Sequence, residues 1–92
     1  MYQVVLSRRY KTALKRLSRH KDFNGETLEK IVETLARGEK LGAKYRDHQL
    51  TGKFSDCREC HLQHNLLLMY QIHENILALL LVDLGTHDDL FR

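Results

Sequence analysis

The chain has 92 residues and a net charge of +3, with 15 lysines and arginines against 12 aspartates and glutamates. Its 42% apolar and 29% charged residues exclude a disordered chain and predict one folded domain over residues 1–92. The charge is uneven, because residues 1–21 hold seven basic and no acidic side chains, whereas residues 22–92 carry a net charge of −4. This asymmetry predicts an anionic partner for the N-terminal segment, either a nucleic acid or an acidic protein.

Membrane-spanning and secreted classes are excluded next. The longest aliphatic run, Ile76–Val82, is far shorter than the ~20 residues that cross a bilayer. The N-terminus has no apolar segment followed by a small-residue cleavage site, because Arg8 and Arg9 interrupt it. We therefore expect a cytoplasmic protein that makes no contact with a membrane.

The first half of the chain predicts a strand followed by two helices. Tyr2–Leu6 is apolar and partly β-branched, which is typical of a strand. Ser7 and Asn24 are suited to cap the two helices, of which the second ends near Gly38. The short link at Asp22–Gly25 predicts an antiparallel helix pair. Apolar side chains recur at helical spacing in both segments: Tyr10, Ala13, Leu14 and Leu17, then Leu28, Ile31, Val32 and Leu35.

The second half predicts a small antiparallel sheet. Residues 43–56 are polar and are expected to form mostly loop, with a short strand at their end, and residues 85–92 a polar tail. Short polar separators between three apolar segments are typical of β-hairpin loops. The three predicted strands are Cys57–Leu62, Leu66–Ile72 and Ile76–Leu84. The order β-α-α-β-β-β predicts an α+β fold in which the two N-terminal helices pack on the sheet.

Three of the six histidines stand at suggestive places. His48 precedes the predicted sheet, His61 lies within it and His87 follows it. Imidazole can accept or donate a proton near neutral pH without a large change in its pKa. The pattern alone leaves two interpretations open: a shared acid–base site without a metal, or surface histidines with no common role.

The segment Cys57–His61 fits the pattern of covalent haem attachment, and with His64 it offers two cysteines and two histidines for zinc. A strand through this segment would place Cys57 and Cys60 on opposite faces of the sheet. Thiols on opposite faces cannot share a metal ion, a porphyrin edge or a disulfide. We therefore expect two unlinked thiols, no metal site and no cofactor.

Several segments together resemble the YafQ-type toxins of the RelE/ParE superfamily. Tyr45–Phe54 is similar to a family segment built around Asp-His, and Cys57–His61 to the family's histidine-bearing strand. Leu67–Tyr70 resembles the strand that follows, Gly85–Phe91 the closing Gly-Thr-His and Leu-Phe pattern, and His20–Asn24 the link between the helices. The resemblance covers nearly the whole chain in order. It implies a RelE/ParE-like fold and favours a shared site for the three histidines.

The resemblance also implies an activity. Such toxins belong to type II toxin–antitoxin pairs and act as ribosome-dependent endoribonucleases, or mRNA interferases, that cleave mRNA in the ribosomal A site. The implied chemistry is independent of metal: a base takes the proton of a ribose 2′-OH, and an acid protonates the 5′-oxygen that leaves. His87 is the expected acid, and His48 or His61 the expected base. The implied partners are mRNA, the ribosome with its rRNA, and a cognate antitoxin of the DinJ/RelB type.

Other site residues follow from the same comparison. Glu59 shares strand parity with His61 and is expected to orient it, and Phe91 matches the family's C-terminal aromatic residue. Asn65 stands where relatives carry an aspartate, so a base role there is in doubt or passes to His64. Asp83 stands where many relatives carry an arginine that stabilises phosphate. Altered activity would follow from either change.

Ten basic side chains are expected to contact RNA or the ribosome: Arg8, Arg9, Lys11, Lys15, Arg16, Arg19, Lys44, Arg46, Lys53 and Arg58. Strand parity points Arg58 to the opposite face from Glu59 unless a bulge intervenes. All acid–base candidates lie outside residues 1–21, which assigns that basic segment to docking against rRNA or the antitoxin. We expect an acidic or amphipathic antitoxin segment to lie against the basic helix or the sheet and to mask the histidines. The alternatives are a ParE-like gyrase poison, or a non-catalytic protein-binding toxin, on the same scaffold.

Overall fold

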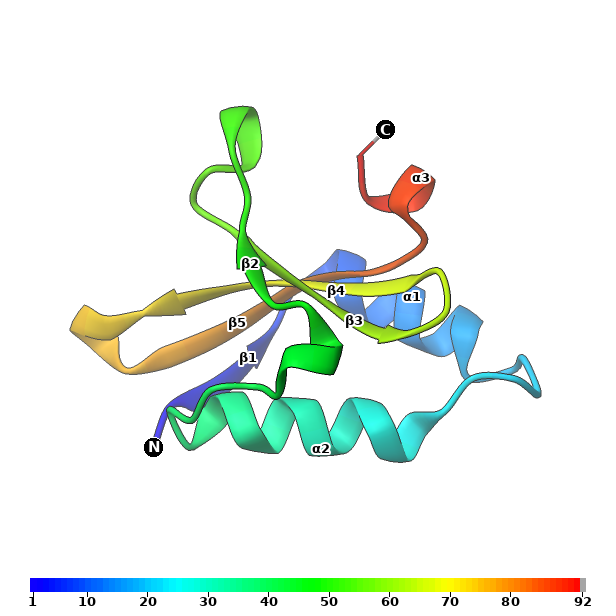
Figure 1. Ribbon diagram of the computed structural model, residues 1–92, viewed down its shortest axis with the longest axis horizontal. Helices are drawn as coiled ribbons and strands as arrows, with labels where there is room; N and C mark the ends of the chain where they lie inside the picture. The colour runs from blue at the N-terminus through cyan, green and yellow to red at the C-terminus, as the bar shows by residue number, and fades with distance from the viewer. Residues whose placement is uncertain (92) are drawn as a thin grey trace.

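The computed structural model describes residues 1–91 as a five-stranded sheet with helices on both of its faces (Figure 1). In chain order the elements are β1 (Gln3–Leu6), α1 (Arg8–Leu17), α2 (Gly25–Ala36), η1 (Ala43–Tyr45), β2 (His48–Gln49), η2 (Gly52–Phe54), β3 (Arg58–Gln63), β4 (Leu66–His73), η3 (Glu74–Ile76), β5 (Ala78–Gly85) and α3 (His87–Leu90). Figure 1 shows α2 running beneath the sheet, while η2 and α3 extend from its other side. Within residues 1–91, no helix has the length and hydrophobicity needed to cross a membrane.

The sheet has the strand order β1-β5-β4-β3-β2. This confirms the α+β fold and the predicted element order, which β2 and α3 extend. The sheet is mixed rather than wholly antiparallel, because β1 pairs in parallel with β5 while all other neighbours are antiparallel. A parallel pair needs a long crossover connection, and the two helices and three strands between β1 and β5 provide one.

The two N-terminal helices begin where the sequence predicts. The Ser7 side chain accepts a hydrogen bond from the Tyr10 amide, and the Asn24 side chain accepts one from the Thr27 amide, so both are N-caps. α2 ends at Ala36, slightly before the predicted end. The apolar faces of both helices share one core cluster with the sheet; its fully buried members include Ile31, Leu68, Tyr70, Leu79 and Leu84.

The second half of the chain differs from prediction at three places. β5 starts at Ala78 rather than Ile76, because the chain first makes the η3 turn and passes through Leu77 at a positive φ of 50°. Ile76 and Leu77 are consequently 73% and 57% exposed despite their hydrophobicity. β2 lies in the middle of residues 43–56 and not at their end. The predicted polar tail contains α3, which Thr86 begins with a capping box.

A second, smaller core lies on the sheet face away from α1 and α2. Its buried members are Cys57, Leu67, Met69 and Leu90, and Leu50, Phe54, Val82 and Phe91 pack against it. This cluster joins η2, the middle strands and α3, the elements that stand above the sheet in Figure 1. Burial of Leu90 therefore anchors α3 close to the polar end of β3 and β4.

Candidate active site

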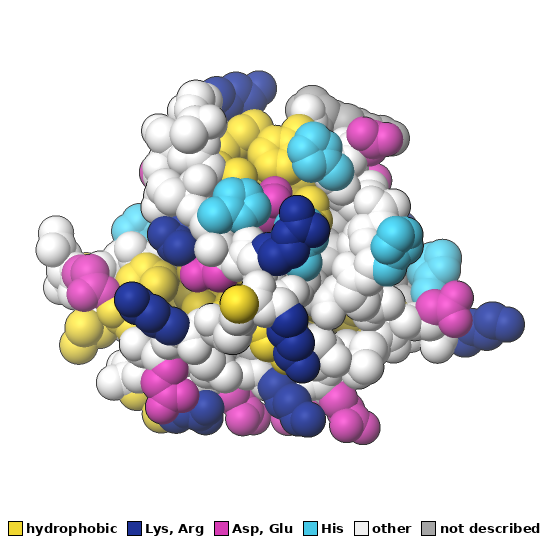
Figure 2. Space-filling view, in the orientation of Figure 1, with side chains coloured by type: hydrophobic (Ala, Val, Ile, Leu, Met, Phe, Trp, Pro, Cys, Tyr) yellow, Lys and Arg dark blue, Asp and Glu magenta, His cyan; other side chains and the backbone are white. Residues whose placement is uncertain are grey.

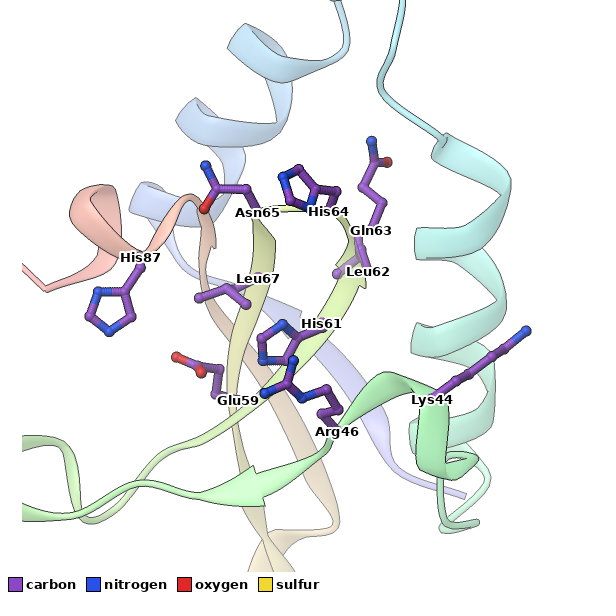
Figure 3. Close-up of a pocket in the computed structure, with 10 residues that line it drawn as sticks. All are labelled: Lys44, Arg46, Glu59, His61, Leu62, Gln63, His64, Asn65, Leu67 and His87. Atoms are coloured by element: carbon purple, nitrogen blue, oxygen red, sulfur yellow. The ribbon is translucent and has the colours of Figure 1, made fainter.

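A pocket of about 570 Å³ opens on this second face, at the end of the β3–β4 hairpin (Figure 3). Its lining contains histidines, cations and one buried carboxylate: Lys44, Arg46, Glu59, His61, Leu62, Gln63, His64, Asn65, Leu67 and His87. In Figure 3 the side chains of Glu59, His61 and Arg46 lie together on one side, with His87 facing them across the pocket. Figure 2, which has the orientation of Figure 1, shows histidines flanking an acidic side chain beside basic groups in the upper half of the molecule.

The β2–β3 pairing brings His48 to the site. His48 lies directly opposite Glu59 in the sheet register, which puts the two side chains on one face. The Nε2 atom of His48 is 3.4 Å from Oε1 of Glu59, and its Nδ1 atom is 2.7 Å from the carbonyl oxygen of Arg46. Both ring nitrogens of His48 therefore face oxygen acceptors. The ring centre of His48 lies 6.4 Å from that of His61.

Glu59 is the unusual group of the pocket. The residue is 5% exposed, and its Oε2 atom is buried without a hydrogen-bond partner among the described residues. A buried carboxylate oxygen that accepts no hydrogen bond is costly, so such a group points to a missing donor.

His61 has the electrostatic surroundings of a proton acceptor. Partial burial lowers its pKa from the ordinary value of 6.5, and the positive charges of Arg46 and His48 lower it further, while the Glu59 carboxylate opposes them. Arg46 is held near the ring by a left-handed backbone conformation, with φ of 51°. A lowered pKa keeps His61 neutral at neutral pH, the form in which an imidazole can accept a proton.

His87 is the first residue of α3, and its position depends on that helix. The Thr86 hydroxyl accepts a hydrogen bond from the Asp89 amide, and the Asp89 carboxylate accepts one from the Thr86 amide. The ring of His87 lies 4.6 Å from that of Phe91, which contacts Phe54 edge-on at 5.2 Å. The aromatic side chains therefore form an apolar wall beside the imidazole.

The structure places the other predicted residues at different distances from the pocket. Asn65 lines it, but has a positive φ of 58° in the tight β3–β4 turn, a conformation that asparagine tolerates better than most residues. Lys44 also lines it, although its side chain points away in Figure 3 and its ammonium lies 5.1 Å from the centre of the Tyr45 ring. Lys53 lies 5.5 Å from the centre of the Phe54 ring.

Arg58 is not part of the pocket. As strand parity predicts, it points to the helix-covered face, where its guanidinium lies 3.1 Å from Asp47 and 3.3 Å from the hydroxyl of Tyr70. Strand patterning could not predict the contacts among Asp47, Arg58 and Tyr70. Asp47 lies in the segment that the sequence predicts as mostly loop, whereas Arg58 and Tyr70 lie on β3 and β4.

Most of the basic side chains on and after α1 are exposed: Arg8, Arg9, Lys11, Lys15, Arg16 and Arg19. Arg9 nevertheless has a partner, because its guanidinium lies 2.6 Å from the carboxylate of Asp83. The Asp83 side chain is only 9% exposed, and it also accepts a hydrogen bond from the Leu84 amide at 2.8 Å. The charge of Asp83 is thus paired with a cation of α1.

Cys57 and Cys60 are free thiols in different core clusters, which confirms that they are unlinked. Burial raises the pKa of the Cys60 thiol to about 12. Across residues 1–91, no group of three or more His, Cys, Asp or Glu side chains is arranged to hold a metal ion.

Comparison with known proteins identifies the family. The sequence profile described as bacterial toxin of type II toxin-antitoxin system, YafQ, matches residues 2–92. The chain belongs to the YafQ toxin family. This confirms the family that the motifs indicate, and with it membership of a type II toxin–antitoxin system. A comparison with curated protein sequences gives no match.

Solved structures of bacterial toxins share the fold. A metal-bound toxin from Helicobacter pylori is 42% identical, with a TM-score of 0.91 over 99% of this chain and 100% of that one. A copper-bound mutant toxin from the same organism is 30% identical, with a TM-score of 0.92 over 99% and 100%. The toxin of the Escherichia coli DinJ–YafQ complex is 26% identical, with a TM-score of 0.85 over the full length of both chains.

Proposed function

We propose that this YafQ-family toxin is a metal-independent endoribonuclease, an mRNA interferase that cleaves mRNA in the ribosomal A site. The observation that supports the proposal best is the pocket, which combines an imidazole with a lowered pKa, a second imidazole across from it and a buried carboxylate with an unsatisfied oxygen. These groups can supply an acid, a base and a hydrogen-bond acceptor for a ribose.

In the proposed reaction, neutral His61 takes the proton from a ribose 2′-OH, and the 2′-oxygen attacks the adjacent phosphorus. The bond from phosphorus to the 5′-oxygen breaks, and His87 gives that oxygen a proton. The products are a 2′,3′-cyclic phosphate and a 5′-OH end. The positive charge of Arg46 stabilises the negative charge that develops on the phosphate, with the His48 ring beside it.

Glu59 and Phe91 complete the proposed site. The Oε1 atom of Glu59 holds His48, and its unsatisfied Oε2 atom accepts a hydrogen bond from a substrate hydroxyl. Phe91, which contacts His87 and Phe54, offers an aromatic surface on which an unpaired base stacks. Asn65, at the rim, can only donate or accept hydrogen bonds and takes no part in proton transfer.

The ribosome and the antitoxin are the proposed partners. Exposed cations of α1, together with Lys44 and Lys53, dock on rRNA, which makes binding weaken steeply with salt and places the activity in the cytoplasm. E. coli YafQ forms a complex with DinJ, and we propose a cognate antitoxin of the DinJ/RelB type here. Its proposed docking surface is the edge of β1, where Val4, Val5 and Leu6 are each about 40% exposed; this edge is opposite to β2 in the sheet, so docking there alone would not mask the histidines as the sequence led us to expect.

A gyrase-poisoning or purely protein-binding toxin is the alternative on this scaffold, and it needs no convergence of histidines. Primer extension on a translated mRNA, with and without ribosomes, separates the two functions. We expect ribosome-dependent cleavage by the wild-type toxin and none by His87→Ala. Growth inhibition that persists unchanged in His87→Ala would contradict the nuclease proposal.

A further inference from the structure

The segment that carries His48 and Arg46 has few attachments of its own. β2 contains only two residues, each paired with one residue of β3, and Arg46 stands two residues before it in a left-handed conformation. Beyond β2, the Leu50 amide donates a hydrogen bond to the carbonyl of Cys57 at 3.0 Å. The Gln49 side chain donates further hydrogen bonds to the carbonyls of Ser55 and Cys57 and accepts one from Arg58, so the chain after His48 is held, but these contacts do not reach Arg46 and Asp47.

A partly buried polar cluster on the other face attaches the chain before His48. Asp47 lies between Arg46 and His48, and its carboxylate accepts hydrogen bonds from the Tyr70 hydroxyl and from Nη2 of Arg58 at 3.1 Å. The Nε atom of Arg58 also lies 3.3 Å from the Tyr70 hydroxyl. Tyr70 is 0% exposed, and in the β3–β4 register it lies opposite Arg58. Charge-assisted bonds of this kind are roughly twice as strong as neutral ones.

Strand geometry couples this cluster to the pocket. Asp47 precedes His48 and Arg58 precedes Glu59, and neighbouring residues of a strand point to opposite faces. One ion pair therefore lies on each face, His48 with Glu59 at the pocket and Asp47 with Arg58 beneath it. A slip of one residue between β2 and β3 would break both pairs. The contact between Asp47 and Arg58 therefore helps to fix the register that places His48 beside Glu59.

We propose that Asp47, Arg58 and Tyr70 are positioning residues, which lock β2 against β3 from beneath the sheet and so hold His48 and Arg46 at the pocket. Burial raises the pKa of the Tyr70 phenol, and the Asp47 carboxylate raises it further, so the hydroxyl remains a donor. The effect on cleavage rests on the proposed nuclease function, whereas the effect on the segment itself does not.

The test compares Tyr70→Phe and Asp47→Asn with the wild-type toxin. Tyr10→Phe is the matched control, because Tyr10 is another buried tyrosine of the same core cluster and lies on α1, away from β2. Amide hydrogen exchange over residues 43–50, with the Leu50 amide as the main probe, reports whether β2 is locked. Cleavage of mRNA on saturating ribosomes reports the rate, and ribosome binding is measured separately.

We expect both variants to exchange faster over residues 43–50 with unchanged exchange in α1 and β5, and to cleave at least about tenfold more slowly with unchanged ribosome binding. Tyr10→Phe should behave as wild type in both measurements. Wild-type exchange over residues 43–50 in a folded Asp47→Asn variant would overturn the inference, and so would faster exchange throughout the protein. Faster local exchange in a toxin whose wild-type form cleaves no mRNA would support the positioning role and overturn the nuclease proposal instead.

Discussion

The ion pair between Arg9 and Asp83 tests whether a basic side chain of α1 stabilises the fold. Arg9→Ala removes the cation 2.6 Å from a carboxylate that is only 9% exposed, and among residues 1–91 it leaves Asp83 with the Leu84 amide as its donor. Removing one partner of a fully buried ion pair lowers the free energy of unfolding by about 3–5 kcal/mol, whereas a surface ion pair contributes about 0.2–1 kcal/mol to it. The Arg9 side chain is 64% exposed and therefore screened by water.

We therefore expect Arg9→Ala to lower the free energy of unfolding by about 1–2 kcal/mol, between those limits. For a domain of this size, 1 kcal/mol corresponds to about 4–8 °C in Tm. Arg16→Ala is the matched control: it lies on the same helix, is also exposed, and should change stability by no more than about 0.5 kcal/mol. Asp83→Asn in the Arg9→Ala background should recover part of the loss, because it removes the stranded charge.

Urea denaturation followed by circular dichroism measures these differences at equilibrium. Ribosome binding at several salt concentrations adds a second readout. Arg16→Ala should reduce the slope of log affinity against log salt by about one, whereas Arg9→Ala should change it less, because the Arg9 charge is already neutralised by Asp83. If Arg9→Ala unfolds at the same urea concentration as Arg16→Ala, the ion pair does not stabilise the fold and this reasoning is wrong.

Three further outcomes are expected. Protonated His61 cannot act as a base, so the cleavage rate should fall as the pH falls through the pKa of His61. Arg46→Ala removes a charge that lowers this pKa, so the acidic limb of the rate profile should move to higher pH. Glu59→Gln removes a charge that raises the pKa, so the limb should move to lower pH. Gly85→Ala should displace α3 and slow cleavage, because the added Cβ would lie 2.8 Å from the capping-box carboxylate of Asp89. Gly42→Ala is the control: open space surrounds this position, so cleavage should be unchanged. Circular dichroism checks that both variants are folded. Toxin that has been treated with EDTA and then freed of the chelator should cleave at the untreated rate on Mg²⁺-containing ribosomes that have been freed of transition metals, and loss of activity after this treatment would contradict a toxin that needs no metal ion of its own.

Local signals predicted much of the fold. Side-chain caps at Ser7 and Asn24 define where the helices begin, and period-two alternation correctly separates Glu59 and His61 from Arg58 and Cys60 on the two faces of β3. These features depend on residues a few positions apart, which is the range over which sequence patterns act. They were sufficient to place two pocket side chains on one face.

The features that the sequence could not predict depend on distant contacts or on special backbone conformations. Leu77 interrupts an unbroken apolar run with a positive φ, which hydrophobic patterning does not detect. The parallel pairing of β1 with β5 joins residues more than seventy positions apart. The bond from Tyr70 to Asp47 is likewise set by register rather than by spacing. α3 was also not predicted, although its start could have been, because Thr86 and Asp89 form a capping box that is visible in the sequence.

The chemistry of the cleaved ends tests the central claim most directly. Ribosomes translating a defined mRNA are mixed with wild-type toxin, with His61→Ala or with His87→Ala, and the ends of the fragments are analysed. The account predicts a 2′,3′-cyclic phosphate and a 5′-OH from the wild-type toxin, and loss of these products in both variants, because each lacks one of the two proton-transfer groups. Fragments with a 5′-phosphate, or cleavage by both variants at the wild-type rate, would contradict it.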